Sequence, residues 1–170
     1  MIHINIGSNL NSKHGTKFEN ISIAIKLLNS SNFKIKRISS FYETPSYPNK
    51  SLPRYINIGL LGVSKNYSTL LKQISLIEKK IGRLRSKKND PRVCDIDIID
   101  FNGITQNSSL LTLPHPRSHK RNFVLYPIKE IDPSWVHPIL KKNVDFLINQ
   151  LDQNSRIEIT RLSKSVIINT

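Results

Sequence analysis

Hydrophobic positions in the first hundred residues recur with two periods that alternate along the chain. A period of two, typical of half-buried strands, marks residues 2–6, 35–42, 55–63 and 93–101. A period of three to four, typical of helices, marks two stripes: Ile21, Ala24, Ile25 and Leu28, then Leu70, Ile74, Ile77, Ile81 and Leu84. The predicted order, β-α-β-β-α-β, is that of a ferredoxin-like α+β core, a mostly antiparallel sheet with both helices on one face.

Polar residues predict where these elements begin and end. Thr16 and Glu19 have the spacing of a capping box for the first helix, and Ser68 is a candidate cap for the second. Segment 45–53 contains three prolines and segment 86–91 is polar, so we expect two loops there.

The hydrophobic pattern is weaker after residue 102. A short strand is predicted at 111–113, and Asn143 is a candidate cap for a helix with the apolar stripe Val144, Leu147, Ile148 and Leu151. Residues 157–159 are predicted to form an edge strand. We expect residues 1–170 to form a single domain, with the helix and strand of 134–170 as C-terminal additions.

The chain is strongly basic, with 26 Lys and Arg against 12 Asp and Glu and a formal charge of +14. Such a balance suggests nucleic acid as a partner. Ile, Asn and Lys, whose codons are rich in A and T, are all abundant, so base composition explains part of the excess. The arginines are more informative because they cluster in the sequence.

Cys94 is the only cysteine, so an internal disulfide cannot form and a reducing compartment is expected. No apolar stretch reaches eighteen residues, and the N-terminus alternates isoleucine with polar residues instead of opening as a signal peptide does. We therefore expect a cytoplasmic protein with no membrane association.

Asp95 and Asp97 are the first candidates for chemistry. In a strand they project from the same face, about 6.6 Å apart along the backbone, while Cys94, Ile96 and Ile98 face the core. Neighbouring carboxylates repel one another unless a cation lies beside them, and Mg²⁺ suits such oxygen ligands. The alternative is a solvated strand face, but the acids lie among cationic residues in an acid-poor chain.

Five arginines lie near these acids in the sequence: Arg83, Arg85, Arg92, Arg117 and Arg121. Arginine makes bidentate phosphate contacts, so a cluster beside a metal-binding strand predicts a triphosphate ligand. Each arginine alone could equally be a surface residue. The chain has no Gly-rich phosphate loop, which excludes a P-loop protein.

Aromatic residues suggest a second half of the site. Tyr55 and Asn57 are expected on one face of their strand, and Phe123 follows Arg121 closely. Two rings can enclose a flat heterocycle while the Asn57 amide binds its edge. Taken singly, each ring is more typical of a hydrophobic core.

Six sequence blocks then occur in a fixed order: Gly7-Ser8-Asn9-Leu10, Phe41-Tyr42-Glu43-Thr44-Pro45, Tyr55-x-Asn57, Glu78-x-x-x-Gly82-Arg83-x-Arg85, Pro91-Arg92-x-x-Asp95-x-Asp97, and Leu113-Pro114-His115-Pro116-Arg117-x-x-x-Arg121-x-Phe123. In these blocks, residues 1–133 resemble the 6-hydroxymethyl-7,8-dihydropterin pyrophosphokinase (HPPK) family of folate biosynthesis. The chain departs from the family pattern at Asp90, where glycine is common, and at Ser46, where proline is often found.

The resemblance implies transfer of pyrophosphate from ATP to 6-hydroxymethyl-7,8-dihydropterin, and loops that close over both substrates. It implies that Asp95 and Asp97 bind two Mg²⁺ ions and that Arg83 and Arg92 join them in catalysis. The implied ATP-binding residues are Glu78, Arg83, Arg85, Arg92, Ile98, Thr112, His115 and Arg121. The implied pterin-binding residues are Thr44, Pro45, Tyr55, Asn57, Asp95 and Phe123.

Two other classes of function stay open at this point. A basic RNA-binding module on a ferredoxin-like sheet would explain the charge, but the paired aspartates would repel phosphate. A metal-dependent nuclease would use the aspartates but needs no pterin pocket. With the pyrophosphokinase we expect ATP and the pterin as partners, no specific nucleic acid, and a monomer.

Overall fold

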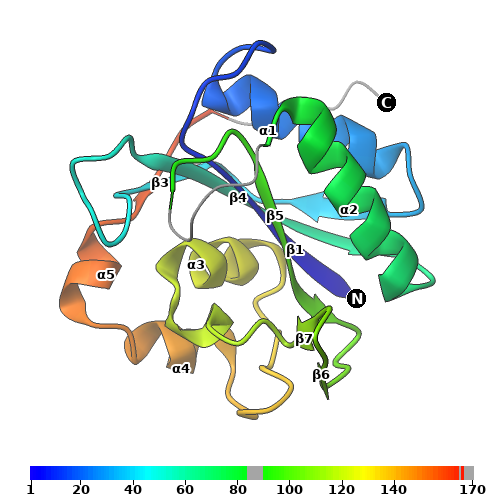
Figure 1. Cartoon of the computed structure of the whole chain (residues 1–170). Coiled ribbons are helices and arrows are strands. Elements are labelled where there is room, and N and C mark those ends of the chain that lie inside the picture. Colours follow the sequence, from blue (N-terminus) through cyan, green and yellow to red (C-terminus); the bar gives the residue numbers. More distant parts are fainter. Residues whose placement is uncertain (84–89, 165, 167–170) are drawn as a thin grey trace.

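The computed structural model describes residues 1–83, 90–164 and 166. Leu84, Arg85 and residues 86–89 of the predicted 86–91 loop lie outside the described residues. The described elements are β1 Ile2–Ser8, α1 Lys17–Asn29, β2 Lys34–Ile38, β3 Tyr42–Thr44, β4 Tyr55–Val63, α2 Tyr67–Ile81, β5 Asp95–Phe101, β6 Gln106–Asn107, β7 Thr112–Leu113, the 3₁₀ turn η1 Ser118–Lys120, α3 Asn122–Ile131, α4 Val144–Asn149, α5 Gln153–Ile157 and β8 Thr160–Arg161 (Figure 1).

The main sheet has the strand order β5-β1-β4-β3-β8, and β2 also pairs with β4. All of these pairs are antiparallel. The order β5-β1-β4-β2, with α1 and α2 as the two crossovers, is the ferredoxin-like arrangement. The predicted fold class is therefore confirmed.

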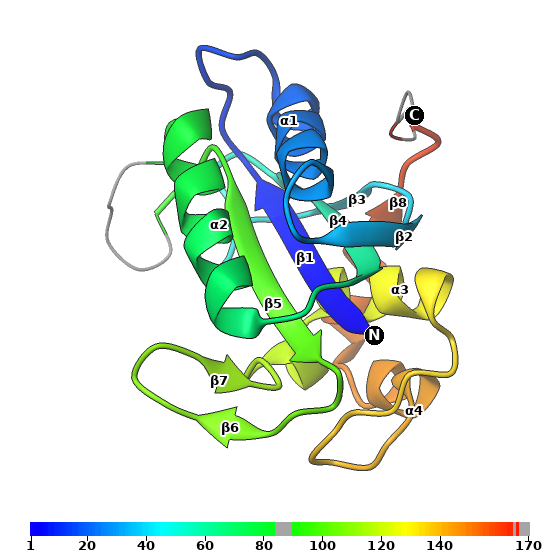
Figure 2. The same cartoon turned by 90° about the vertical axis from the view of Figure 1, so that its right-hand side faces the viewer.

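Helices cover both faces of this sheet, whereas the hydrophobic pattern predicted helices on one face. Figure 2 shows α1 and α2 together on one side and α3 and α4 on the other. The first face packs on α1 and α2 through alternate strand residues such as Ile4, Ile6 and Ile58. The second face packs on α3, which approaches β4 closely at Gly59: a Cβ there would lie 2.7 Å from Pro127 Cβ.

The predicted start of α1 is confirmed, and that of α2 is wrong by two residues. The Thr16 N–H donates to Glu19 Oε2 at 2.6 Å, as in a capping box. For α2 the cap is Asn66, whose side chain accepts from the N–H groups of Ser68 and Thr69. The helix ends at Gly82, whose left-handed backbone (φ 109°) favours glycine.

The predicted strand 35–42 is two strands, β2 and β3, which pair with different parts of β4. Between them, the Ser39 hydroxyl accepts the Gly59 N–H at 2.9 Å, so a side chain replaces one rung of the ladder. The period of two does not reveal this break, because buried positions continue across it.

The C-terminal third differs most from the sequence prediction. The predicted strand at 111–113 is present as the short β7, paired with β6. Asn143 caps α4 as expected and accepts the Phe146 N–H at 2.8 Å. The strand predicted at 157–159 is wrong: α5 ends at Ile157, which is exposed, and β8 at Thr160–Arg161 pairs with β3. In the part of the chain that the structure describes, no helix is long and apolar enough to span a membrane.

Candidate functional site

A row of residues crosses three neighbouring strands on the sheet face opposite α1 and α2. Gly7 of β1 pairs with Asn57 of β4 on one side and with Asp95 of β5 on the other. Directly paired residues share a face, so Asp95 and Asn57 point to the same side of the sheet. A Cβ at Gly7 would lie 3.0 Å from Asn57 Oδ1, so glycine leaves room at the centre of the row.

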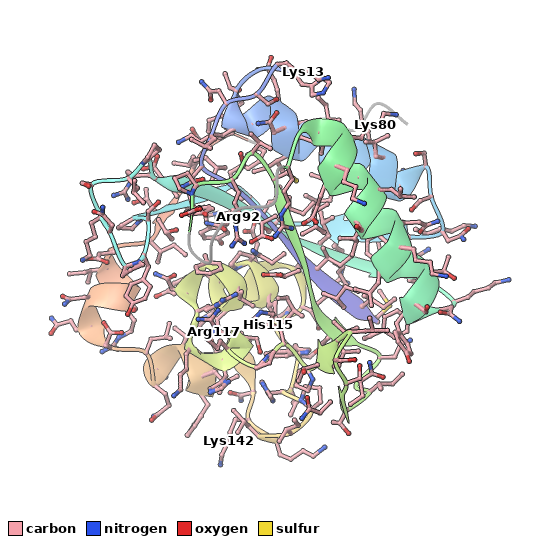
Figure 3. All side chains as sticks on the ribbon, in the orientation of Figure 1. Lys13, Lys80, Arg92, His115, Arg117 and Lys142 are labelled. Atoms are coloured by element: carbon pink, nitrogen blue, oxygen red, sulfur yellow. The ribbon has the colours of Figure 1, made fainter. Side chains whose placement is uncertain are left out.

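Two arginines bind Asp95. Its Oδ2 lies 2.6 Å from Arg92 Nη1, and its Oδ1 lies 3.0 Å from Arg83 Nη1. Arg83 follows the end of α2, and Arg92 precedes β5. The predicted clustering of arginines around the aspartates is thus present for these two, and Figure 3 shows Arg92 in front of the sheet.

Glu78 holds Arg83 and the start of β5 in place. Its buried carboxylate accepts the Ile96 N–H at 2.8 Å and forms an ion pair with Arg83. Burial raises the pKa of Glu78 to about 6, although the charge of Arg83 and the Ile96 hydrogen bond oppose this effect. Glu78 therefore connects the two elements that contribute Arg83 and Asp95.

Asp97 faces a second cationic group at the start of α3. Its Oδ2 lies 3.5 Å from Arg121 Nη1 and 4.0 Å from His115 Nε2. Burial and the neighbouring Asp95 both raise the pKa of Asp97. Arg121 also lies over the Phe123 ring, at 5.3 Å from its centroid.

His115 lies among cations beside Asp97. Burial, and then the charges of Arg121 and Arg117, lower the pKa of His115 to about 4. Its Nδ1 accepts the Arg117 N–H at 3.2 Å, and its Nε2 lies 3.4 Å from Arg121 Nη1. The backbone N–H of His115 donates to the carbonyl of Ile99 at 2.8 Å, so the turn is fastened to β5. The imidazole is therefore neutral near pH 7 and lies between Arg117, Arg121 and Asp97.

Most of the residues expected to bind a heterocycle lie at the other end of the row. Asn57 Nδ2 donates to Thr44 Oγ1 at 3.3 Å, and Thr44 pairs with Tyr55 in the sheet. Thr44 and Asn57 are buried, Tyr55 and Phe123 are half-buried, and Pro45 continues directly from β3. Phe123 lies in the first turn of α3, beneath the Arg121 guanidinium, so the two rings come from separate elements.

Two of the predicted site residues stand apart from these clusters, and the position of a third is not described. Arg85 lies outside the described residues. The Ile98 side chain is in the hydrophobic core and cannot contact a ligand. The N–H of Ile96 points away from β1, toward Glu78, and the N–H of Ile98 points the same way because it is two residues further along the strand. A ligand would therefore meet Ile98 only through its backbone. Thr112 is on β7, where its hydroxyl donates to Asn107 Oδ1 at 2.9 Å.

Sequence reasoning missed the role of Ser8 and Asn9, at the end of β1. Ser8 Oγ donates to the carbonyl of Val93 at 2.8 Å, and Asn9 binds the backbone of Arg92. The signal was available, because Gly7-Ser8-Asn9-Leu10 stood out as a block, but its partners are more than eighty residues away. Helix α3, which presents Phe123, was also missed.

Arginines and lysines occupy different parts of the molecule. Arg92, His115 and Arg117 are seen near the middle of the molecule in Figure 3, whereas Lys13, Lys80 and Lys142 are seen at its periphery. The site therefore contains the arginine cluster that the sequence predicted, and the labelled lysines lie away from it.

Comparisons with known proteins agree with this geometry. The family model described as 7,8-dihydro-6-hydroxymethylpterin-pyrophosphokinase (HPPK) matches residues 3–133. The chain is 35% identical over 151 residues to the 2-amino-4-hydroxy-6-hydroxymethyldihydropteridine pyrophosphokinase of Synechocystis, covering 88% of this chain and 75% of that protein. The corresponding protein of Aquifex aeolicus is 33% identical over 142 residues, covering 83% of this chain and 86% of that protein.

Other relatives are longer proteins. The chain is 37% identical over 141 residues to the folic acid synthesis protein FOL1 of Dictyostelium discoideum, covering 82% of this chain but only 21% of FOL1. The Plasmodium falciparum HPPK-DHPS structure with STZ-DHP has a similar fold, with a TM-score of 0.70 at 15% identity over 94% of this chain and 46% of that one. These matches favour the pyrophosphokinase over the RNA-binding and nuclease alternatives. The chain belongs to the HPPK family, the 7,8-dihydro-6-hydroxymethylpterin pyrophosphokinases of folate biosynthesis.

Proposed function

We propose that this chain transfers the β,γ-pyrophosphoryl group of ATP to the hydroxymethyl oxygen of 6-hydroxymethyl-7,8-dihydropterin and releases AMP. The observation that carries the proposal is the row on one sheet face. It sets the Asp95 carboxylate and its two arginines beside the buried Asn57 amide and the Tyr55 ring, with Asp97 on the same face of β5. Phosphate chemistry and heterocycle recognition would then occur side by side.

The arginines and His115 would bind the triphosphate. Arg83 and Arg92 contact Asp95, and Arg121 lies near Asp97, so these cations are already gathered where phosphate would enter. Arginine favours such a role because its planar guanidinium binds two phosphate oxygens at once. The neutral His115 would place a polar imidazole beside the phosphates without adding charge.

Asp95 and Asp97 fit Mg²⁺. Both are carboxylates on one face of a single strand, and Mg²⁺ is commonly held by one or two carboxylates together with water and phosphate oxygens. Among the described residues, no three His, Cys, Asp or Glu side chains converge on one point, so the two aspartates would be the protein's share of the ligands. Bound Mg²⁺ would neutralise charge on the phosphate oxygens.

The pterin would lie between Tyr55 and Phe123. Asn57 offers a donor and an acceptor to the edge of a flat ring, and Thr44 orients the Asn57 amide through their hydrogen bond. Asp95, the next residue along the row, would then lie near the hydroxymethyl group.

Positioning and electrostatics would supply most of the rate enhancement. The hydroxymethyl oxygen attacks the β-phosphorus in line, the bond from that phosphorus to the oxygen bridging toward the α-phosphorus breaks, and AMP leaves. The hydroxyl proton passes to water. We assign no described side chain as a strong base.

The C-terminal residues would support the site from behind. Trp135, Val144, Leu147 and Leu151 pack with α3, the helix that begins beside Arg121 and presents Phe123. We infer from this packing that residues 1–170 act as one catalytic domain. We also propose that the chain acts as a monomer, and sedimentation would test that state.

Mass spectrometry of the reaction products tests the proposal. Incubation with Mg-ATP and 6-hydroxymethyl-7,8-dihydropterin should yield AMP and the pterin diphosphate in equal amounts. No product should form with EDTA or with 6-methyl-7,8-dihydropterin, which lacks the hydroxyl. Formation of ADP, or of AMP without any pterin, would contradict the proposal.

A further inference from the structure

Asn9 fixes the backbone of Arg92. Its Oδ1 accepts the Arg92 N–H at 2.6 Å, and its own N–H donates to the Arg92 carbonyl at 3.0 Å. Leu10 donates a second N–H to the same carbonyl at 3.2 Å. Both peptide groups of Arg92 are therefore held by the end of β1, next to the strand position that pairs with Asp95.

The other end of the Asn9 side chain holds the loop that follows Thr44. Asn9 Nδ2 lies 3.2 Å from Ser46 Oγ and 3.2 Å from the carbonyl of Pro53, and donates to both. Ser46 Oγ in turn donates to that carbonyl at 2.6 Å. Ser46 and Pro53 are near the two ends of the 45–53 loop, so this triangle of hydrogen bonds closes the base of the loop.

One buried side chain thus joins two segments that serve different substrates. Asn9 is 2% exposed and Ser46 is 3% exposed, so water does not substitute for these contacts. The 45–53 loop continues from Thr44, on the pterin side. Arg92 binds Asp95, on the phosphate side.

We propose that Asn9 is a positioning residue, whose carboxamide sets the distance between the pterin side and the triphosphate side of the site. This inference rests on the proposed function. In-line transfer requires the alcohol and the phosphorus to be held close and aligned, and a displacement of about 1 Å can cost about 100-fold in rate. Asn9 would act through Arg92 and the loop, without touching either substrate.

Ser46 is the side chain in the 45–53 loop that contacts Asn9. Its hydroxyl both accepts from Asn9 and donates to Pro53, which a proline could not do. We infer that in this chain Ser46 belongs to the same positioning unit as Asn9.

Steady-state kinetics of Asn9→Ala provide the first test, with both substrates saturating. We expect kcat to fall about 10- to 100-fold, while the Kd of a nonhydrolysable Mg-ATP analogue changes less than about threefold, because Arg92 and Asp95 remain. Asn143→Ala is the control, since it removes the exposed capping asparagine of α4, which is not among the proposed site residues, and should leave kcat unchanged.

A purely structural role would give a different result. Asn9→Ala would then lower the melting temperature as Asn143→Ala does, with kcat within about twofold of the wild type, and the proposal would be wrong. If the wild-type chain makes no pterin diphosphate, the proposed function itself fails. These two failures are therefore distinguishable.

Two further variants, Asn9→Asp and Ser46→Ala, separate the contact of Asn9 with Arg92 from its contact with the 45–53 loop. They also test the proposal if Asn9→Ala does not fold. Aspartate can still accept the Arg92 N–H but cannot donate to Ser46 or Pro53, so the KM for the pterin should rise about 3- to 10-fold while analogue affinity is kept. Ser46→Ala should have a similar, smaller effect and add little in the Asn9→Asp background. Additive losses, or a normal pterin KM in both variants, would overturn the proposal.

Discussion

Ionisation of Glu78 should have a measurable effect on stability. Its carboxylate is buried between α2 and β5, and it binds Arg83 and the Ile96 N–H. Glu78→Gln keeps an oxygen that can accept the Ile96 N–H but removes the charge. Arg83 is not left alone, because it also lies 3.0 Å from Asp95. We therefore expect the variant to be more stable than the wild type near neutral pH.

The size of this effect follows from the pKa of Glu78. Burial raises that pKa from 4.5 to about 6, even though Arg83 already lowers it. Below pH 4.5 the group is protonated in both the folded and unfolded states and costs nothing. Between pH 4.5 and 6 the unfolded chain ionises first, so stability falls as pH rises. Above pH 6 the loss reaches about 2 kcal/mol, which glutamine avoids.

Thermal unfolding of the wild type and Glu78→Gln at several pH values measures this difference. In EDTA without nucleotide, the melting temperature of the variant should exceed that of the wild type by roughly 4 to 8 °C at pH 7.5. The two curves should converge near pH 4.5. A variant that is less stable at pH 7.5, or a difference that does not change with pH, would refute the argument that burial outweighs the ion pair.

Three further predictions concern activity and loop order. Asp95→Asn and Asp97→Asn should keep the circular dichroism spectrum but lose at least about 100-fold in turnover, because each removes a carboxylate charge proposed to bind Mg²⁺; near-normal turnover in both would mark the acids as a solvated pair. Arg121→Ala should reduce kcat/KM far more than Lys142→Ala, and equal losses would argue against a phosphate role for the arginine. Backbone hydrogen exchange in residues 45–53 should slow when Mg²⁺, a nonhydrolysable ATP analogue and the pterin are all present; unchanged exchange in that loop would count against its closure.

The overall charge leads to one more prediction. If the lysines are mainly solvated surface residues, nucleic-acid binding should be nonspecific, with Kd values on the order of 10⁻⁴ to 10⁻⁶ M, and strongly weakened by salt. Fluorescence titration at near-physiological salt measures this. Submicromolar, sequence-selective RNA binding that persists with saturating Mg-ATP would require a separate explanation for the charge.

Local sequence patterns predicted the framework of this protein because strand and helix periods depend on near neighbours. The alternation through Asp95, Ile96 and Asp97 correctly placed the two acids on one face and the isoleucine in the core. The capping box at Thr16 and the cap at Asn143 were likewise readable, since each acts within one turn. The β-α-β-β-α-β order followed from these periods alone.

The hydrophobic pattern gave wrong or missing elements in three places. The break between β2 and β3 depends on a hydrogen bond from Gly59 to Ser39, twenty residues apart, which no local period records. Helix α3 contains Pro127 and packs on a glycine of β4, so its stability comes from tertiary contact more than from its own sequence. The edge strand was placed at 157–159 because the alternation there resembles a strand, yet pairing with β3 occurs at Thr160–Arg161.

The sequence by itself determined which residue types are available for chemistry. It also determined which face of each helix or strand they occupy, because the face depends only on the local period of the backbone. Only the tertiary structure decided which of them meet. Glu78 was expected among nucleotide contacts, but the fold makes it the buried link between Arg83 and β5. The residues next to Asn9 in the sequence do not reveal its role. Its partners Ser46 and Arg92 are brought to it by the pairing of β1 with β4 and β5 and of β3 with β4. Contacts between distant residues depend on the packing of all the elements together, and this is why they could not be predicted from any single segment.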